Sequence, residues 1–269
     1  MKKRAISGLG GIIAAYLFIH WGGIPFFLLV MGIMTAAMLE YYRMCLDGGV
    51  PVIRWWGVIL AVLLLSGAFF SGRSDLEPDF ARLIITASVA LTFFVFLFSK
   101  NASGSFAGYS LTLTGVFYIG WLILHGILLR EIRPFGREFM LTAALCTWSA
   151  DTGAYITGKR FGRARLHPVS PNKTRAGAAG SVVFAVLTAV VLKYVYGLYF
   201  ITPQSAAFLG LLIGVFSIAG DLAESVLKRS FETKDSGEFL PGHGGFLDRI
   251  DSLLFTVPLV YYYALWVLR

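Results

Sequence analysis

Acidic side chains stand at both ends of a short polar segment, residues 225–251, which lies between two strongly apolar stretches. Asp221 and Lys228 are seven residues apart, so on a continuous helix they share one face. Asp248 and Asp251 are three residues apart and share a face of the next helix. Carboxylate oxygens at two neighbouring helix ends suit Mg²⁺, which proteins hold through one or two carboxylates plus the phosphates of a substrate. The spacing therefore predicts a metal-assisted phosphate site.

The same segment carries the glycines and bases that a phosphate site needs. Glycine allows a ligand to approach the backbone closely, and lysine and arginine neutralise phosphate charge. The bases that we expect to meet phosphate here are Lys228, Arg229, Lys234 and Arg249. His243, between two glycines, is either a hydrogen-bonding group of the loop or a catalytic group.

Each acid also has a structural interpretation. Asp248 could cap the last helix or offset its dipole, and Asp221 with Glu224 could pair with Lys228 in an interfacial salt-bridge cluster. For one acid alone the structural interpretation is the better one. Four acids, four bases and a histidine around one glycine-rich connection favour a functional site.

The composition is that of an integral membrane protein. Apolar residues make up 57% of the 269 residues, charged residues only 14%, and the mean hydropathy is +0.73, which lies outside the range of soluble globular domains. The net charge of +8 does not predict nucleic-acid binding, because the bases do not form arms with interleaved aromatic residues in a polar setting. Anionic ligands and membrane orientation explain the charge better.

The apolar stretches recur along the whole chain at lengths that can cross about 30 Å of hydrocarbon. The expected fold class is all-α, a polytopic membrane protein of about nine transmembrane helices. The first and third stretches are short, so a count of eight or a re-entrant segment is the alternative. The expected spans are residues 5–20, 23–42, 55–71, 81–98, 106–129, 138–157, 176–196, 204–224 and 250–268.

Lysine and arginine counts predict the orientation, because short cytoplasmic loops are enriched in them. With nine spans, most of the 23 basic residues lie on the side of the N-terminus, which we expect to be cytoplasmic. The charged loops 158–175 and 225–249 then face the same compartment and can build one site. We expect residues 1–136 to form N-terminal packing helices and residues 137–269 to form the catalytic region of a cell-membrane enzyme.

Three sequence blocks resemble one enzyme family. The polar segment resembles the C-terminal signature of the phosphatidate cytidylyltransferases, also called CDP-diacylglycerol synthases. Two shorter blocks are similar to family elements before and within the basic loop, although Arg175 and Ala176 depart from the family pattern. The matching residues are Ser225-x-Leu227-Lys228-Arg229, Lys234-Asp235, Leu240-Pro241-Gly242-His243-Gly244-Gly245-Phe246-x-Asp248-Arg249-Ile250-Asp251, Ala150-Asp151-Thr152-Gly153-Ala154-Tyr155, Gly158-Lys159-Arg160-Phe161-Gly162 and Ser170-Pro171-Asn172-Lys173-Thr174.

The resemblance implies transfer of a cytidylyl group from CTP to phosphatidate. It also implies one or two divalent ions as cofactors, of which one is Mg²⁺ and a second cation is of unspecified identity. In this interpretation Asp221 and Asp248 hold the metal, and Asp251 is either a further ligand or a residue that supports the ligands. His243 hydrogen-bonds the leaving pyrophosphate. The residues expected to bind the phosphates or the nucleotide are Asp151, Lys159, Lys173, Lys228, Arg229, Lys234 and Arg249.

Two rival functions follow from the same features. A transporter of an anionic solute would also place charge between helices, although deeper in the spans and in related halves. A CDP-alcohol phosphotransferase would need an acid-rich DG-x-x-AR motif, which the sequence lacks. Expected partners are CTP, phosphatidate and membrane lipids, and a homodimer formed by the N-terminal spans.

Several isolated polar residues and both cysteines are expected to have no role in the site. We expect Glu40 and Lys193, at the ends of spans, to extend toward the membrane interface. His125 is expected to be structural, and Cys45 and Cys146 to be buried thiols, because neither cysteine has zinc-site spacing.

Overall fold

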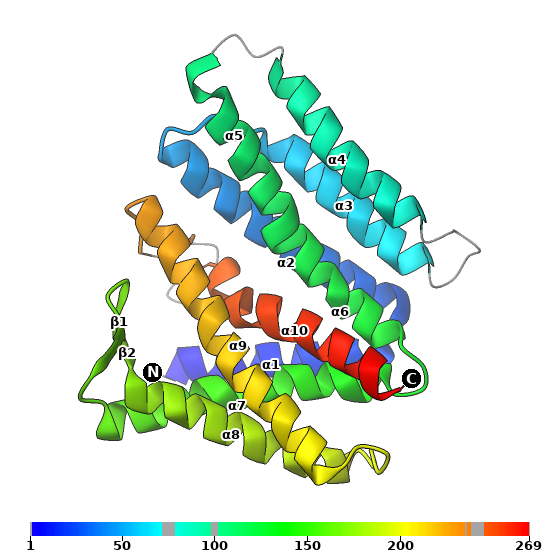
Figure 1. Ribbon diagram of the computed structural model, residues 1–269, viewed down its shortest axis with the longest axis vertical. Helices are drawn as coiled ribbons and strands as arrows, with labels where there is room; N and C mark the ends of the chain where they lie inside the picture. Colours follow the sequence, from blue (N-terminus) through cyan, green and yellow to red (C-terminus); the bar gives the residue numbers. More distant parts are fainter. Residues whose placement is uncertain (1, 72–78, 98–101, 235, 238–244, 269) are drawn as a thin grey trace. The chain divides into compact units, whose positions relative to one another are not determined.

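The computed structural model describes residues 2–71, 79–97, 102–234, 236–237 and 245–268, which are mostly helical (Figure 1). The chain forms two compact units. The first comprises residues 1–131 and 230–249, and the second comprises residues 132–229 and 250–269. The polar segment that the sequence singles out is thus shared between the two units.

The first unit is built from helices that the apolar stretches predict. Helices α5 and α6 are joined without a break by a π-helical turn, so they form one long helical segment. The elements are α1 (Lys2–Trp21), α2 (Gly23–Asp47), α3 (Arg54–Ser71), α4 (Asp79–Leu97), α5 (Ala102–Gly115), the π-helical turn (Val116–Trp121) and α6 (Leu122–Glu131).

Two buried tyrosines fasten α2 to α5 in the first unit. The hydroxyl of Tyr42 donates to the backbone oxygen of Thr112 at 2.8 Å, and Tyr41 donates to that of Leu111 at 3.0 Å. Gly57 and Gly115 leave room for the Tyr42 ring, because a Cβ atom at either position would collide with it. The buried polar groups are thereby satisfied, as an apolar environment requires.

The second unit holds the remaining helices and one hairpin. Residues 247–249 of α10 belong to the first unit, and its residues from 250 onward belong to the second. The elements are α7 (Gly136–Phe161), β1 (Arg165–His167), β2 (Ser170–Thr174), α8 (Arg175–Val195), α9 (Pro203–Ser230) and α10 (Leu247–Val267).

Glycines allow α8 and α9 to approach closely. A Cβ atom on Gly210 would lie 2.5 Å from Cα of Val186, and one on Gly214 would lie 2.6 Å from Cα of Val182. Small residues four apart at such a contact are typical of helix pairs in membranes. Helices α7 and α8 lie side by side in the same unit (Figure 1).

The hairpin β1–β2 is a departure from the all-α expectation. Residues 158–175 were expected to be a charged loop, but Arg165 pairs with Thr174 and His167 pairs with Ser170 in an antiparallel ladder. The hydroxyl of Thr174 then accepts a hydrogen bond from the Gly177 amide at 3.1 Å and caps α8. Strands of three and five residues are too short to show a clear alternating pattern.

Membrane character is supported by helix length and composition. Among the residues that the structure describes, five helices are long and apolar enough to cross a membrane, and each of the nine expected spans falls within or largely within a helical segment. All nine crossings stay predictions. The five are Gly23–Asp47, Phe106–Glu131, Arg175–Val195, Pro203–Ser230 and Leu247–Val267.

The expectations for residues outside the site are confirmed for three of them and wrong for a fourth. Cys45 and Cys146 are buried, and the buried His125 places Nδ1 2.8 Å from the backbone oxygen of Trp121. Lys193 does not extend outward, because it is only 5% exposed and its ammonium lies 4.3 Å from the centre of the Tyr194 ring. A cation over an aromatic face keeps favourable electrostatics when it is partly desolvated.

Candidate active site

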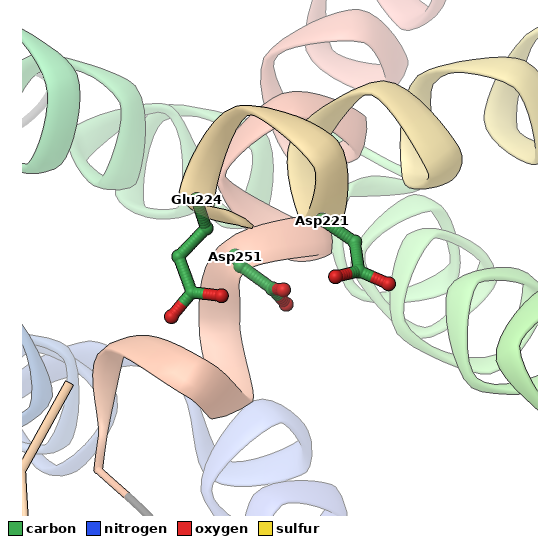
Figure 2. A group of neighbouring side chains, drawn as sticks. All are labelled: Asp221, Glu224 and Asp251. Atoms are coloured by element: carbon green, nitrogen blue, oxygen red, sulfur yellow. The ribbon is translucent and has the colours of Figure 1, made fainter. Parts of the chain in front are cut away.

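Three carboxylates converge in the second unit. Asp221 and Glu224 come from one turn of α9, and Asp251 comes from the first turns of α10 (Figure 2). Each offers an oxygen, and these atoms all lie within 4.8 Å of one another. Glu224 and Asp251 are buried, whereas Asp221 is partly exposed. We call these three residues the acidic cluster.

A close contact between α9 and α10 brings the acidic cluster together. A Cβ atom on Gly220 would lie 2.6 Å from the backbone oxygen of Asp251, so only glycine fits there without a shift. One turn earlier, the hydroxyl of Ser252 donates to the backbone oxygen of Ser217 at 3.2 Å. Small residues on α9 therefore determine how closely Asp221 and Asp251 approach.

Two lysines neutralise part of the acidic charge. Lys173 Nζ, from strand β2, lies 2.6 Å from Asp221 Oδ1, and Lys228 Nζ lies 2.8 Å from Glu224 Oε2. The second pair is the i, i+4 contact that the structural interpretation of this helix face anticipates. The first pair joins residues 48 positions apart, which the helix pattern alone does not predict.

A cavity of about 360 Å³ lies beside Asp221 in the second unit. Asp151 is on its wall and accepts a hydrogen bond from the Ser217 hydroxyl at 3.1 Å. Lys159, Asn172 and Lys173 also line it. The wall therefore combines acidic, basic and amide groups from α7, β2 and α9, a set that suits a charged ligand with hydrogen-bonding groups.

Asp248 lies in the first unit, with a different set of contacts. Its Oδ2 accepts hydrogen bonds from the Ser236 amide at 3.2 Å, the Ser236 hydroxyl at 2.9 Å and the Gly245 amide at 2.8 Å. The Gly245 amide lies two residues before α10, so its bond holds the backbone that enters the helix. An acid in the first turn also offsets the helix dipole, as the structural interpretation foresees. Its role as a metal ligand stays a prediction.

Glu40 of α2 holds the same backbone. Its Oε1 accepts from the Phe246 amide at 3.0 Å, and its Oε2 accepts from the Leu247 amide at 3.0 Å and the Ser236 hydroxyl at 3.3 Å. The expectation that Glu40 extends toward the interface is therefore wrong. An acid near the end of an apolar helix shows no local sign of a partner 206 residues away.

Comparison with known proteins identifies the family. The sequence profile described as "Cytidylyltransferase family" matches residues 2–267. The chain belongs to this family. Phosphatidate cytidylyltransferases from Synechocystis sp. and Bacillus subtilis are each 34% identical to it, over 99% and 97% of this chain respectively and 97% of each relative. The enzyme of that name from Staphylococcus epidermidis is 38% identical over 97% of both chains.

The other residues expected to bind substrate in this cytidylyltransferase family member lie at helix ends or on loops. Lys159 is exposed, with its ammonium 5.8 Å from the centre of the Tyr155 ring. Arg229, Lys234 and Arg249 are exposed as well. His243 lies outside the described residues.

Two residues join the candidate site that the sequence analysis did not assign to it. Glu224 was counted among the four acids that favour a functional site, but it was given no role in holding the metal, although its three-residue spacing from Asp221 was the available signal. Ser217, one turn before Asp221, supplies a hydroxyl to Asp151. A serine within an apolar helix carries a weak signal, because it is equally common at plain helix contacts.

Proposed function

We propose that this chain transfers the cytidylyl group of CTP to phosphatidate, giving CDP-diacylglycerol and pyrophosphate. The observation that carries the proposal is the acidic cluster with Lys173 beside it, in a chain that matches phosphatidate cytidylyltransferases over nearly its whole length. An anionic nucleotide and an anionic lipid repel each other, so a site that joins them must supply compensating positive charge.

The acidic cluster fits a divalent cation. Its donors are carboxylate oxygens, which Mg²⁺ prefers, and they are already close enough to share one ion. Asp221 and Asp251 would hold the ion with Glu224, and Asp248 remains a predicted ligand. A bound Mg²⁺ would neutralise phosphate charge and polarise the phosphoryl group under attack.

The basic residues hold the two substrates in line. Lys173 is positioned to exchange its contact with Asp221 for a phosphate oxygen when substrate enters. Lys228, Arg229, Lys234 and Arg249 are proposed to bind the remaining phosphate groups. Asp151 and Lys159 orient the nucleotide from the cavity wall.

The reaction proposed is a single in-line displacement. A phosphate oxygen of phosphatidate attacks the α-phosphorus of CTP, and the bond from that phosphorus to the oxygen that it shares with the β-phosphorus breaks, so this oxygen leaves with pyrophosphate. The attacking oxygen is already an anion, so no residue needs to remove a proton. His243 is proposed to hydrogen-bond the departing pyrophosphate. Catalysis then rests on positioning and charge stabilisation.

The membrane arrangement is part of the proposal. Nine crossings with a cytoplasmic N-terminus would place loops 158–175 and 225–249 at the cytoplasmic face of the cell membrane, where CTP is available. Phosphatidate would enter from the leaflet with its phosphate at the interface. A homodimer through the N-terminal helices completes the proposed assembly.

Isotope labelling tests this assignment. Purified protein in mixed micelles is given phosphatidate, Mg²⁺ and CTP labelled at either the α- or the γ-phosphate. We expect α-label in the lipid fraction and γ-label in pyrophosphate only. Accumulation of an anionic solute by proteoliposomes, without labelled lipid, would instead support the transporter alternative.

A further inference from the structure

We propose that Glu40 is a positioning residue, which holds the Ser236 hydroxyl on one side of the glycine-rich segment 238–244 and the backbone amides of Phe246 and Leu247 on the other, in the arrangement that turnover requires. The inference rests on the proposed function, and it concerns a residue that lies outside all three sequence blocks that resemble the family. It comes entirely from contacts within the first unit.

The first step is the engagement of both Glu40 oxygens. The amides of Phe246 and Leu247, at the start of α10, each donate to Glu40 at 3.0 Å. The first amides of a helix have no partner within the helix, and a negative charge at that end is stabilised by the helix dipole. Glu40 thus acts as a capping group supplied by a distant helix.

The second step is steric. For Gly237, the nearest atoms to an added Cβ all belong to Glu40, the closest being Oε1 at 2.8 Å. An added Cβ on Gly245 would also collide with the Glu40 carboxylate, as well as with the Ser236 hydroxyl. The position of the Glu40 carboxylate therefore requires glycine at both 237 and 245. A Glu40 side chain that extended into solvent would not require glycine at these positions.

The third step links Glu40 to Asp248. The Ser236 hydroxyl lies 3.3 Å from Glu40 Oε2 and 2.9 Å from Asp248 Oδ2, and Ser236 is only 4% exposed. One buried serine therefore contacts both carboxylates, and Asp248 also accepts from the Gly245 amide. Releasing Glu40 would loosen the backbone that fixes the Asp248 carboxylate. Positioning of this kind affects the chemical step when a small displacement misaligns reacting groups.

The decisive variants are Glu40→Gln and Glu40→Ala, with Asp47→Asn as the matched control. Gln keeps the size of Glu but loses the charge and one acceptor oxygen. Asp47 is an acid of the same helix, and it pairs with the exposed Arg43 at 3.7 Å. We expect Glu40→Gln to lower kcat about tenfold and Glu40→Ala to lower it further. KM for CTP should stay within about threefold, and Asp47→Asn should match wild type.

A double-mutant cycle adds a readout that loss of fold would not produce. Gly237→Ala is expected to lower kcat because the new methyl group displaces Glu40. In the Glu40→Ala background, where the atoms that the methyl group would meet are absent, the same substitution should therefore cost much less than it does alone. Equal costs in both backgrounds would show that Gly237 and Glu40 act independently.

The outcomes separate this inference from the proposed function. If wild type forms CDP-diacylglycerol and Glu40→Gln retains full kcat, Glu40 is not a positioning residue, while the proposed function stands. If wild type forms no product, the proposed function is wrong, and the inference about Glu40 is overturned with it. A Glu40→Gln protein with lowered thermal stability but unchanged kcat per folded molecule would assign Glu40 a structural role only and overturn the inference.

Discussion

Lys173 Nζ lies 2.6 Å from Asp221 Oδ1, so the hairpin between α7 and α8 is tied to α9. The side chain of Lys173 is 20% exposed and that of Asp221 is 41% exposed. Because water screens a pair with this exposure, the contact contributes little to stability by itself. Its value in the proposed reaction is positional, since it keeps the base that we propose for a phosphate next to the acid that we propose for a metal.

Replacement of Lys173 should damage catalysis far more than stability. We expect Lys173→Met to lower kcat/KM about 100-fold or more, because an ammonium group that meets phosphate in the transition state is lost. Lys173→Arg should retain part of the activity. Initial rates over a range of CTP concentrations provide the measurement.

Arg43→Met is the matched control for Lys173→Met, because it also removes the basic partner of an aspartate. The side chains of Arg43 and Asp47 are 82% and 69% exposed, so Arg43→Met should leave thermal stability nearly unchanged. Activity near the wild-type level in Lys173→Met would remove Lys173 from the proposed site.

Removal of an acidic-cluster oxygen should weaken the stabilisation of the protein by metal. Mg²⁺ that binds the folded state raises the melting temperature, and the rise grows with the logarithm of its concentration. We expect Asp251→Asn and Glu224→Gln to reduce this rise, measured by thermal unfolding in detergent without nucleotide. Glu138→Gln, which removes an acid at the start of α7 and outside the acidic cluster, should leave the rise in melting temperature intact. An unchanged rise in both cluster variants would contradict the assignment of the ion to these residues.

Chelation should stop turnover reversibly. Excess EDTA is expected to bring CDP-diacylglycerol formation to background, because the phosphate charges lose their main compensation. Added Mg²⁺ should restore the rate without refolding. Full activity in a large excess of chelator would show that the acids serve another purpose.

The contact between α8 and α9 should not tolerate larger residues. Because Cα of Val182 lies 2.6 Å from the position of a Cβ on Gly214, we expect Gly214→Val to destabilise the protein by about 1–3 kcal/mol. Thermal unfolding in detergent measures the change. Gly32→Ala is the control, since nothing lies within 4 Å of its added Cβ atom. Equal melting temperatures for Gly214→Val and wild type would contradict this packing.

Orientation is open to a labelling test. Both native cysteines are buried, so they should react little and give a low background of labelling. Arg163 is exposed, so a cysteine placed there should be accessible to a thiol reagent. We expect an impermeant maleimide to label Arg163→Cys in inside-out vesicles only, because the loop is proposed to be cytoplasmic. Labelling in intact spheroplasts would reverse the proposed topology.

Local patterns predict much of this protein because its helices and its polar segment are continuous in sequence. Apolar stretches indicated where helices lie, and the spacing of Asp221 and Lys228 placed both on one helix face. The short polar run from Ser225 to Asp251 was enough to suggest the family, which the match over residues 2–267 now confirms.

Contacts between distant residues could not be predicted in the same way. Glu40 and Leu247 are 207 positions apart, and the sequence around neither residue predicts a contact with the other. The hairpin at residues 165–174 depends on pairing of very short strands, and the approach of Asp251 to Asp221 depends on the space left by Gly220. Such relationships require the three-dimensional structure.

The most direct test of the central claim is the rate at which purified protein forms CDP-diacylglycerol from CTP and phosphatidate with Mg²⁺, compared between wild type and Asp221→Asn. Asp221 belongs to both the acidic cluster and the pair with Lys173. We predict rapid product formation by wild type and a rate at least about 100-fold lower for folded Asp221→Asn. Equal rates for the two proteins, or no product from folded wild type, would contradict the account.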